Sequence, residues 1–350
     1  MSDIANLSKG IGISKDQLSA DGEPCILYGE LYTKYKSETI KEVISKTNID
    51  NTKLVKSKAN DVIIPCSGET AEEIVTARCV LKDDVLLGGD LNIIRLHGYD
   101  GSFMSYQLNG KRKYDIAKVA QGVSVVHLYG EHLKNIKTIN PSLNEQKKIA
   151  NLLSLLDERI STQNKIIDKL QSLIKGITQN IVHHNKPNVH ISDCMECSTS
   201  TLQESDVLEN GIYPVYGANG IVGYLDNYNT QNEAIYIIKD GSGVGTVSYV
   251  TGKCSATGTL NILQAKEGFA LQYLYYLMKV FNFEPYKTGM AVPHIYFKDY
   301  SKAKVFCPSN TVQLQYAKLL SVIDCKLSTE QDILTRLSLQ KQYLLRQMFI

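Results

Sequence analysis

The sequence predicts an α/β (α+β) protein in which two pseudo-repeated globular domains are joined by two long antiparallel coiled-coil helices. Two observations predict this architecture. The chain repeats itself at a fixed offset, and the most regular part of each repeat has the apolar periodicity of a long helix. The predicted division is 1–142 for the first globular domain, 143–185 for the first helix, 186–307 for the second globular domain and 308–350 for the second helix.

The internal repeat is strictest after each globular domain. Pro141-Ser142 recurs as Pro308-Ser309, an offset of 167 residues (308 minus 141). The residues that follow match at the same offset in the pairs Gln146/Gln313, Ala150/Ala317, Leu153/Leu320, Asp157/Asp324, Ile166/Ile333 and Leu170/Leu337. The globular parts match with more drift, in the pairs Leu27–Gly29/Val215–Gly217, Asp90–Ile93/Thr259–Ile262 and Gln121–Leu128/Thr288–Ile295. Each half is therefore a variable globular unit followed by a more constant tail.

Both tails are predicted to be long helices. Their apolar residues recur at alternating spacings of four and three, which is the seam of a coiled coil. The first seam is Ile149, Leu153, Leu156, Ile160, Gln163, Ile167, Leu170, Ile174, Ile177 and Ile181, and the second is Tyr316, Leu320, Ile323, Leu327, Glu330, Leu334, Leu337, Lys341, Leu344 and Met348. Gln163 and Glu330 occupy equivalent places, so we expect a polar layer there that fixes the register.

Helix length favours pairing of the two tails over the alternative, in which each helix covers its own domain. A helix of about 40 residues is roughly 60 Å long, more than the diameter of one globular domain. Pro141 and Pro308 precede the helix starts, where a missing N–H costs little, and Lys186-Pro187 favours the end of the first helix.

Short runs rich in branched residues predict strands in both globular units. Asp61–Pro65 and Ala234–Ile238 are such runs. The second is followed by the glycine-rich stretch Gly241–Gly245, which leads into the strand-like Thr246–Val250. A dinucleotide loop would open a helix instead, so these glycines are not interpreted as a nucleotide site.

Composition indicates a globular protein of the cytoplasm. The chain has 350 residues and is 43% hydrophobic, without an apolar stretch long enough for a membrane span or a secretory signal at its start. The eight cysteines are sparse, so we expect reduced thiols and no disulfides.

No local motif predicts catalysis, a metal site or a cofactor. Cys194-x-x-Cys197 has no second Cys or His pair nearby at zinc spacing. His127 and His294 fall at equivalent places in the repeat, and we interpret them as buried structural histidines rather than catalytic ones.

A net charge of only +2 does not by itself indicate that the protein binds nucleic acid. If DNA is bound, local patches must contact phosphate, and the candidates are Lys34, Lys36 and the run Lys111-Arg112-Lys113. The alternative is that such patches are simply solvated surface. The second globular domain contains no arginine.

The order of these features resembles the specificity subunits of type I restriction-modification systems. Tyr213–Gly220 and Pro24–Tyr32 are similar to the opening of that family's target-recognition domains, and the Gly-x-x-x-x-His segments and Pro-Ser/Gln helix starts fit the same pattern. The resemblance covers nearly the whole chain. It implies a noncatalytic subunit that recognises a double-stranded DNA target of two half-sites, carries two DNA methyltransferase (modification) subunits on its helices, and works with restriction (motor-nuclease) subunits.

Candidate DNA contacts lie in the loops rich in glycine, tyrosine and lysine. In the first domain they are Tyr28, Gly29, Tyr32, Lys34, Lys36, Ser67, Lys111, Arg112 and Lys113. In the second they are Tyr216, Gly217, Asn219, Gly220, Lys239 and Ser242. Because that domain lacks arginine, contacts of Asn or Gln to adenine are favoured there.

Two other functions fit parts of the pattern. A duplicated enzyme that binds a nucleotide or a sugar would explain two globular units, and strong thermal stabilisation by such a ligand would identify it. A coiled-coil scaffold would explain the helices but leaves the globular units without a role.

Overall fold

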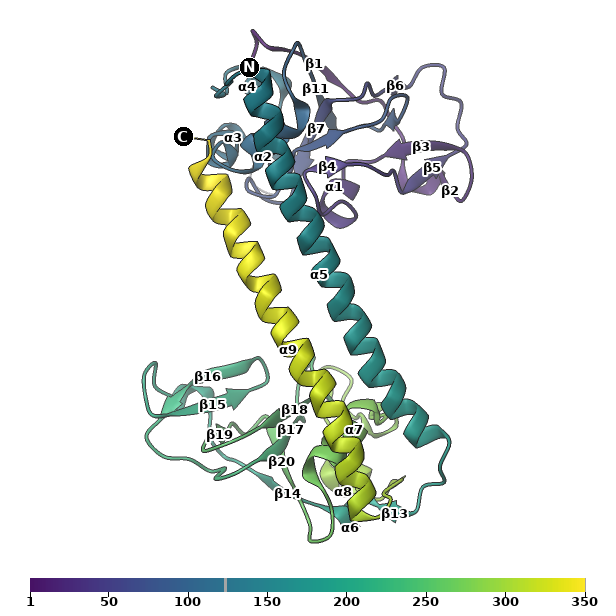
Figure 1. Cartoon of the computed structure of the whole chain (residues 1–350), viewed down its shortest axis with the longest axis vertical. Helices are drawn as coiled ribbons and strands as arrows, with labels where there is room; N and C mark the ends of the chain where they lie inside the picture. The colour runs from purple at the N-terminus through teal and green to yellow at the C-terminus, as the bar shows by residue number, and fades with distance from the viewer. Residues whose placement is uncertain (123–124, 350) are drawn as a thin grey trace. The chain divides into compact units, whose positions relative to one another are not determined.

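The computed structural model describes residues 1–122 and 125–349 (Figure 1). The chain divides into two compact units: unit 1 comprises Met1–Lys165 and Asp332–Ile350, and unit 2 comprises Ile166–Gln331. Each of the two long helices, α5 (Leu143–His183) and α9 (Asn310–Gln347), contributes one part to each unit. The α/β architecture with long helices that the sequence predicts is thus present.

Unit 1 contains two five-stranded sheets. The first has the order β1-β11-β7-β9-β4, with bounds Ala5–Lys9, Leu91–Leu96, Asp61–Pro65, Arg78–Val80 and Thr39–Ile40. The second has the order β2-β5-β3-β10-β6, with bounds Leu18–Ser19, Ser45–Thr47, Glu23–Ile26, Leu86–Leu87 and Val55–Lys56. A separate pair joins β8 (Ser67–Gly68) to β12 (Val126–His127). The helices are α1 (Glu30–Thr33), α2 (Gly101–Asn109), α3 (Lys113–Val119) and α4 (Gly130–Lys134).

Unit 2 also contains two sheets, which are smaller than those of unit 1. Its four-stranded sheet has the order β14-β20-β17-β18, with bounds Met195–Thr199, Leu260–Ala265, Ala234–Ile238 and Val247–Val250. A smaller sheet has the order β16-β15-β19, with bounds Gly220–Leu225, Tyr213–Gly217 and Ser255–Ala256. The remaining pair is β13 (Val189–His190) with β21 (Lys304–Val305), and the short helices are α6 (Ile191–Cys194), α7 (Leu271–Val280) and α8 (Phe297–Tyr300).

Strand pairing confirms that the globular parts are repeats. The antiparallel series β1-β11-β7-β9 corresponds to β14-β20-β17-β18, and the parallel pair β3/β10 corresponds to β15/β19. Buried Asn92 on β11 faces Lys9, the last residue of β1, as buried Asn261 on β20 faces Thr199, the last residue of β14. Asn92 and Asn261 are 169 residues apart (261 minus 92), so the equivalent strands are shifted by two residues from the offset of 167 that the helices follow.

The predicted strand β7 is buried along its whole length because both faces of its sheet are covered. Val62 and Ile64 pack against Met104 of α2, while Ile63, which points to the opposite face, packs with the core around Ile26. Alternation of side chains along a strand makes a continuous apolar run necessary at such a position. The other predicted strand, β17, has the same burial pattern.

The starts of both long helices are built alike. The side chain of Gln146 donates to the carbonyl oxygen of Pro141 (2.8 Å) and accepts from the backbone N–H of Asp100 (2.9 Å). Gln313 makes the same pair of bonds, with Pro308 (2.8 Å) and with the N–H of Ala270 (2.9 Å). Each glutamine thereby fixes the angle at which its helix leaves the adjoining globular part.

Within unit 1 the two long helices run antiparallel (Figure 1). The first turns of α5 pack against the last turns of α9, in a cluster that contains Leu153, Tyr106, Leu344 and Phe349. Farther along α5, Asp157 forms an ion pair with Lys341 of α9. The polar seam residues Gln163, in unit 1, and Glu330, in unit 2, are both buried.

Candidate nucleic-acid interface

The first candidate site is a groove in unit 1, with a cavity of about 900 Å³, which we call the recognition groove. It is lined by Tyr28, Gly29, Tyr32, Thr33, Ser67, Gly68, Glu69, Thr70, Glu72, Glu73, Thr76, Arg78, Lys113 and Val125. The fold thus brings together candidates that lie far apart in the sequence, because α1, the strand β8 and the start of α3 all border the same groove.

Helix α1 is held in place by a buried carboxylate. Glu30 accepts hydrogen bonds from the backbone N–H of Leu27 (3.1 Å) and from the ammonium of Lys34 (2.6 Å). The hydroxyl of Tyr32 donates to the carbonyl oxygen of Ser67 (3.1 Å), which ties α1 to the opposite wall of the groove. Lys34 is therefore engaged in an ion pair with Glu30, although its side chain is 37% exposed. Lys36 is exposed as well, and within the described residues it forms no ion pair.

The walls of the recognition groove carry both signs of charge. Glu69, Glu72 and Glu73 stand on one stretch of the wall, and Arg78 and Lys113 provide the basic groups. The guanidinium of Arg78 donates to the carbonyl oxygens of Ala77 and Tyr35 (both 3.1 Å). Burial lowers the pKa of Arg78, although the charges of Glu38 and Asp157 oppose this. Such a mixed surface suits hydrogen bonding to base edges better than contact with phosphate alone.

The basic run in unit 1 does not act as one patch. Lys113 lines the recognition groove, Arg112 lies 3.4 Å from Asp115 with its side chain only 18% exposed, and Lys111 is exposed. Lys111 and Arg112 lie in the turn between α2 and α3, whereas Lys113 is the first residue of α3.

The candidates of unit 2 lie on two neighbouring loops. Gly217 pairs with Gly220 across the turn of the β15–β16 hairpin, which leaves Asn219 exposed at its tip. Gly220 has a φ of +97°, which explains why glycine occupies this turn. Tyr216 is half-buried and its ring packs on Tyr236 (5.8 Å), so part of this side chain belongs to the core.

The second loop follows strand β17. Ser242 is exposed, and Lys239 is half-buried with its ammonium 3.8 Å from Asp240. The glycines here lead into strand β18, as predicted, so they do not form the helix-opening loop of a dinucleotide site.

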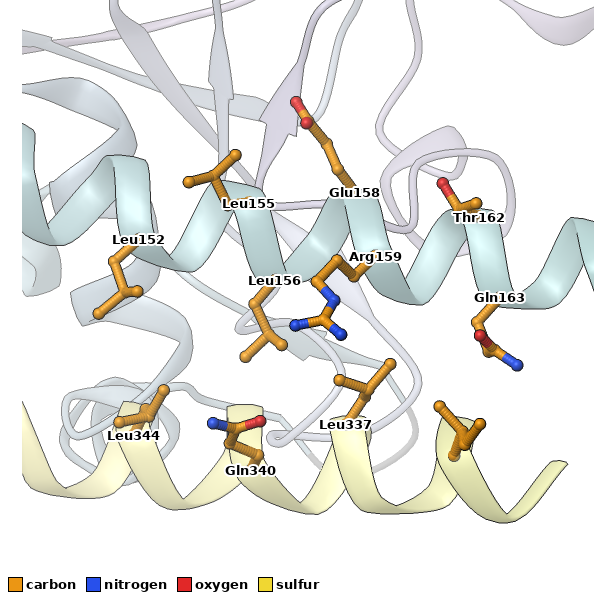
Figure 2. Close-up of a pocket in the computed structure, with 11 residues that line it drawn as sticks. Leu152, Leu155, Leu156, Glu158, Arg159, Thr162, Gln163, Leu337, Gln340 and Leu344 are labelled. Carbon is orange, nitrogen blue, oxygen red and sulfur yellow. The ribbon is translucent and has the colours of Figure 1, made fainter. Parts of the chain in front are cut away.

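The helices carry a second kind of surface. A shallow groove of about 650 Å³ lies between α5 and α9 within unit 1 and is lined by Leu152, Leu155, Leu156, Glu158, Arg159, Thr162, Gln163, Ile333, Leu337, Gln340 and Leu344. Figure 2 shows Leu156 and Leu337 pointing toward the facing helix, whereas Leu155 points away from α9.

Exposed leucines outside the seam recur at equivalent places on the two helices. Leu152 and Leu155 of α5 are 49% and 51% exposed, and Leu319 and Val322 of α9 are 50% and 63% exposed. Sequence reasoning missed this face. The signal was the presence of apolar residues beside the seam at the same offset in both tails.

The interpretation of the two repeat histidines as buried was wrong. His127 is exposed and His294 is half-buried, because each lies at the end of a surface loop rather than under the sheet. Residues 123–124 lie outside the described residues.

Most of the cysteines are buried, with Cys197 half-buried and Cys325 exposed. All eight carry free thiols, and the thiol of Cys194 donates to the carbonyl oxygens of His190 (3.5 Å) and Ile191 (3.4 Å). Across residues 1–122 and 125–349, no three His, Cys, Asp or Glu side chains gather as a metal site would require. In the same residues, no helix combines the length and apolar character needed to cross a bilayer.

Comparison with known proteins agrees with this architecture. A family model described as the type I restriction modification DNA specificity domain matches residues 1–172 and 187–339. A putative type I specificity subunit of Mycoplasma genitalium is 25% identical over 74% of this chain and 73% of its own length. The specificity subunit of the type I restriction enzyme EcoprrI of Escherichia coli is 23% identical over 49% of this chain, and the chain spans only 38% of the length of that relative.

Solved structures show the same fold. The crystal structure of the type I restriction-modification system S subunit from M. genitalium superposes with a TM-score of 0.71 at 18% identity, covering 100% of this chain and 94% of that one. A chain from a study of complex assembly and conformational transition of the type I R-M system gives a TM-score of 0.54 at 14% identity, covering 98% and 95%. With two family matches that together span both repeats, the chain belongs to the type I restriction modification DNA specificity domain family.

Proposed function

We propose that this chain is the DNA-specificity subunit of a type I restriction-modification enzyme and that each globular part reads one half of a bipartite target. The observation that carries the proposal is the duplication: one sheet plan occurs twice, and each copy is fixed by a buried glutamine to its own long helix. Helices that join two DNA-reading domains would set the number of base pairs between the half-sites.

The proposed division of labour follows the sequence repeats. Residues 1–142 and 186–307 are the target-recognition domains, and 143–185 and 308–350 are the spacer helices. In the first domain, Tyr28, Tyr32 and Lys113 on the recognition groove are proposed to face base edges. The acidic wall of the groove would accept hydrogen bonds from cytosine or adenine amino groups and would repel phosphate.

In the second domain, the hairpin tip with Asn219 and the loop with Ser242 are proposed to enter the major groove. Both side chains are exposed, and both can donate and accept hydrogen bonds. Because no arginine is present in residues 186–307, adenine is the base that this domain is expected to read.

The exposed leucine faces of the helices are proposed to hold two methyltransferase subunits. Leu152 and Leu155 on one helix and Leu319 and Val322 on the other offer two equivalent apolar surfaces, which suits two copies of one partner. Restriction subunits would complete the enzyme. The chain itself supplies recognition rather than catalysis, and its proposed place of action is on DNA in the cytoplasm.

Reconstitution tests the proposal. The chain mixed with its methyltransferase subunit should methylate one split DNA sequence, which sequencing of methylated bases would identify, whereas the chain alone should transfer no methyl groups. If both proteins are folded and associated yet no sequence-specific methylation appears, the proposal is wrong. Strong thermal stabilisation of the chain by a nucleotide or sugar would instead support a small-molecule enzyme.

A further inference from the structure

Each unit carries a cluster of three surface side chains at the end of its Gly-x-x-x-x-His segment. We call the part of the chain that ends at His127 in unit 1, and at His294 in unit 2, the closing loop. In unit 1, the rings of His127 and Tyr129 stack with centroids 6.1 Å apart. In unit 2, His294 and Tyr296, the same positions in the repeat, lie with centroids 5.3 Å apart. Both tyrosines are exposed, at 44% and 46%, and each directly precedes a short helix, α4 or α8.

A lysine lies over each of these tyrosine rings. The ammonium of Lys9 is 5.6 Å from the ring centroid of Tyr129, and that of Lys298 is 5.2 Å from the centroid of Tyr296. A cation over the face of an exposed aromatic ring is weakly attracted to it. The ring therefore holds each ammonium in place without neutralising it.

The two lysines come from different elements. Lys9 ends β1, and its counterpart at the end of β14 is Thr199. Lys298 lies on α8, and the residue 167 positions earlier is Glu131. The lysine thus comes from a strand in unit 1 and from a helix in unit 2, yet in both units its ammonium lies over the tyrosine ring. The cluster is therefore common to two surfaces that otherwise differ.

Each cluster adjoins the loops proposed to read bases. His127 pairs with Ser67, and Val126 pairs with Gly68, on the wall of the recognition groove. His294 forms a bridge with Asp240, and the carbonyl oxygen of Pro293 accepts from the N–H of Gly241 (2.9 Å). A ligand bound at either cluster would therefore lie beside the base-reading loop of the same unit.

Both ammonium groups are available to a ligand. Lys9 and Lys298 are exposed, and within the described part of the chain neither makes an ion pair. Of the acidic groups nearby, Glu131 is engaged by Lys134 (2.6 Å), and Asp299 follows Lys298 directly in α8.

We propose that these His-Tyr-Lys clusters bind DNA phosphates, one in each half-site, without regard to base sequence. The inference rests on the proposed function and deepens it. The lysine ammonium and the tyrosine hydroxyl would donate to phosphate oxygens, and the histidine ring positions the tyrosine. The backbone is the part of DNA that is the same in every half-site, which explains a feature common to two units that read different bases.

The test uses the complete complex of this chain with its methyltransferase. Binding to two duplexes is measured over a range of salt concentrations. One duplex contains the sequence that the complex methylates, and the other lacks it. Lys9→Gln and Lys298→Gln should each reduce the slope of log affinity against log salt by about 0.9, and the double variant by about 1.8. Affinity should fall by the same factor for both duplexes, and the methylated sequence should stay unchanged.

Two kinds of control variant accompany the test. Lys137→Gln and Lys302→Gln remove exposed lysines of units 1 and 2 outside the clusters and should leave the slope unchanged. Tyr129→Phe and Tyr296→Phe remove a neutral donor, so affinity should fall while the slope stays the same.

Three results would overturn the proposal: a slope unaffected by both lysine changes, a loss confined to the target duplex, or dissociation of the methyltransferase. The second would indicate base reading and the third a protein-binding surface. If the unaltered complex neither binds DNA nor methylates a sequence, the proposed function itself has failed, which is a separate result.

Discussion

The ammonium of Lys341 lies 2.6 Å from a carboxylate oxygen of Asp157, joining α9 to α5 inside unit 1. The same ammonium is 2.6 Å from Glu38, and the hydroxyl of Tyr106 donates to Asp157 at 2.7 Å. Lys341 occupies a seam position at which the repeat has Ile174. The buried ionic cluster therefore belongs to unit 1, where it links the globular part to both long helices.

The charges of this cluster depend on one another. Burial alone would raise the pKa of Asp157, but the charge of Lys341 and the hydrogen bonds from Lys341 and Tyr106 hold it below the ordinary value. Burial raises the pKa of Glu38. The charge of Lys341 opposes this, the charge of Asp157 adds to it, and the net direction is upward because burial is the largest effect. Burial would lower the pKa of Lys341, but the two carboxylates raise it.

Replacing Lys341 alone should therefore destabilise unit 1. Lys341→Met removes the ion-pair partner of two buried carboxylates, which typically costs about 3–5 kcal/mol. Urea unfolding should show this loss, and Glu38→Gln with Asp157→Asn in the same chain should restore most of it. Ile174→Met at the equivalent seam position is the matched control and should cost less than about 1.5 kcal/mol. Equal stability of Lys341→Met and the unaltered protein would show that the cluster contributes no net stability.

A methyl group at Gly289 should open the loop that ends at His294. Gly289 has a φ of +88°, and a Cβ there would meet the carbonyl oxygen of Val292 at 2.2 Å. Gly289→Ala should cost about 1–3 kcal/mol locally, so the amide of Thr288, bonded to the carbonyl oxygen of His294 (2.9 Å), should exchange hydrogen faster. Gly252→Ala introduces a methyl group at a φ of +77° in open space on another loop, so it is the control and should leave exchange at Thr288 unchanged. If Gly289→Ala also leaves that exchange unchanged, the loop is not held by this glycine.

Charge placed on one leucine face should remove one methyltransferase subunit. Leu155→Glu and Val322→Glu each bury a carboxylate in the proposed interface, which is costly when the charge has no partner. Native mass spectrometry should show one partner bound to each single variant and none to the double variant. Leu339→Glu is the control, since Leu339 is 60% exposed but its counterpart in the repeat is Ser172. Unchanged stoichiometry in the double variant would place the partners elsewhere.

The cysteines should differ in how fast they are alkylated and in how that rate depends on pH. Burial raises the pKa of Cys197 to about 11, so its thiol stays protonated near neutral pH and reacts slowly. Its rate should rise about tenfold with each pH unit between about pH 7 and pH 9.5, since only the thiolate reacts. Exposed Cys325 should be the first to react with iodoacetamide, and Cys325→Ser should remove that fast step in intact-mass measurements. A rate for Cys197 that levels off below about pH 9 would contradict the raised pKa.

The sequence alone determined the repeat, the two helices and the strands β7 and β17, because these depend on periodicity along the chain. Fixed spacing of apolar residues is visible wherever a helix or strand must bury one face or two. The same regularity identifies Gln146 and Gln313 as equivalent residues, and their matching hydrogen bonds agree with this equivalence.

Only the tertiary structure decided which side chains share a surface. Lys34 and Lys36 are two residues apart and both exposed, yet only Lys34 is paired with a carboxylate among the described residues, that of Glu30. Lys9 and Tyr129 are distant in sequence and meet only because β1 ends beside the closing loop. Contacts of this kind arise from packing between elements, which local propensity does not encode, so the recognition groove, the buried Lys341 cluster and the two His-Tyr-Lys clusters emerge only once the chain is folded.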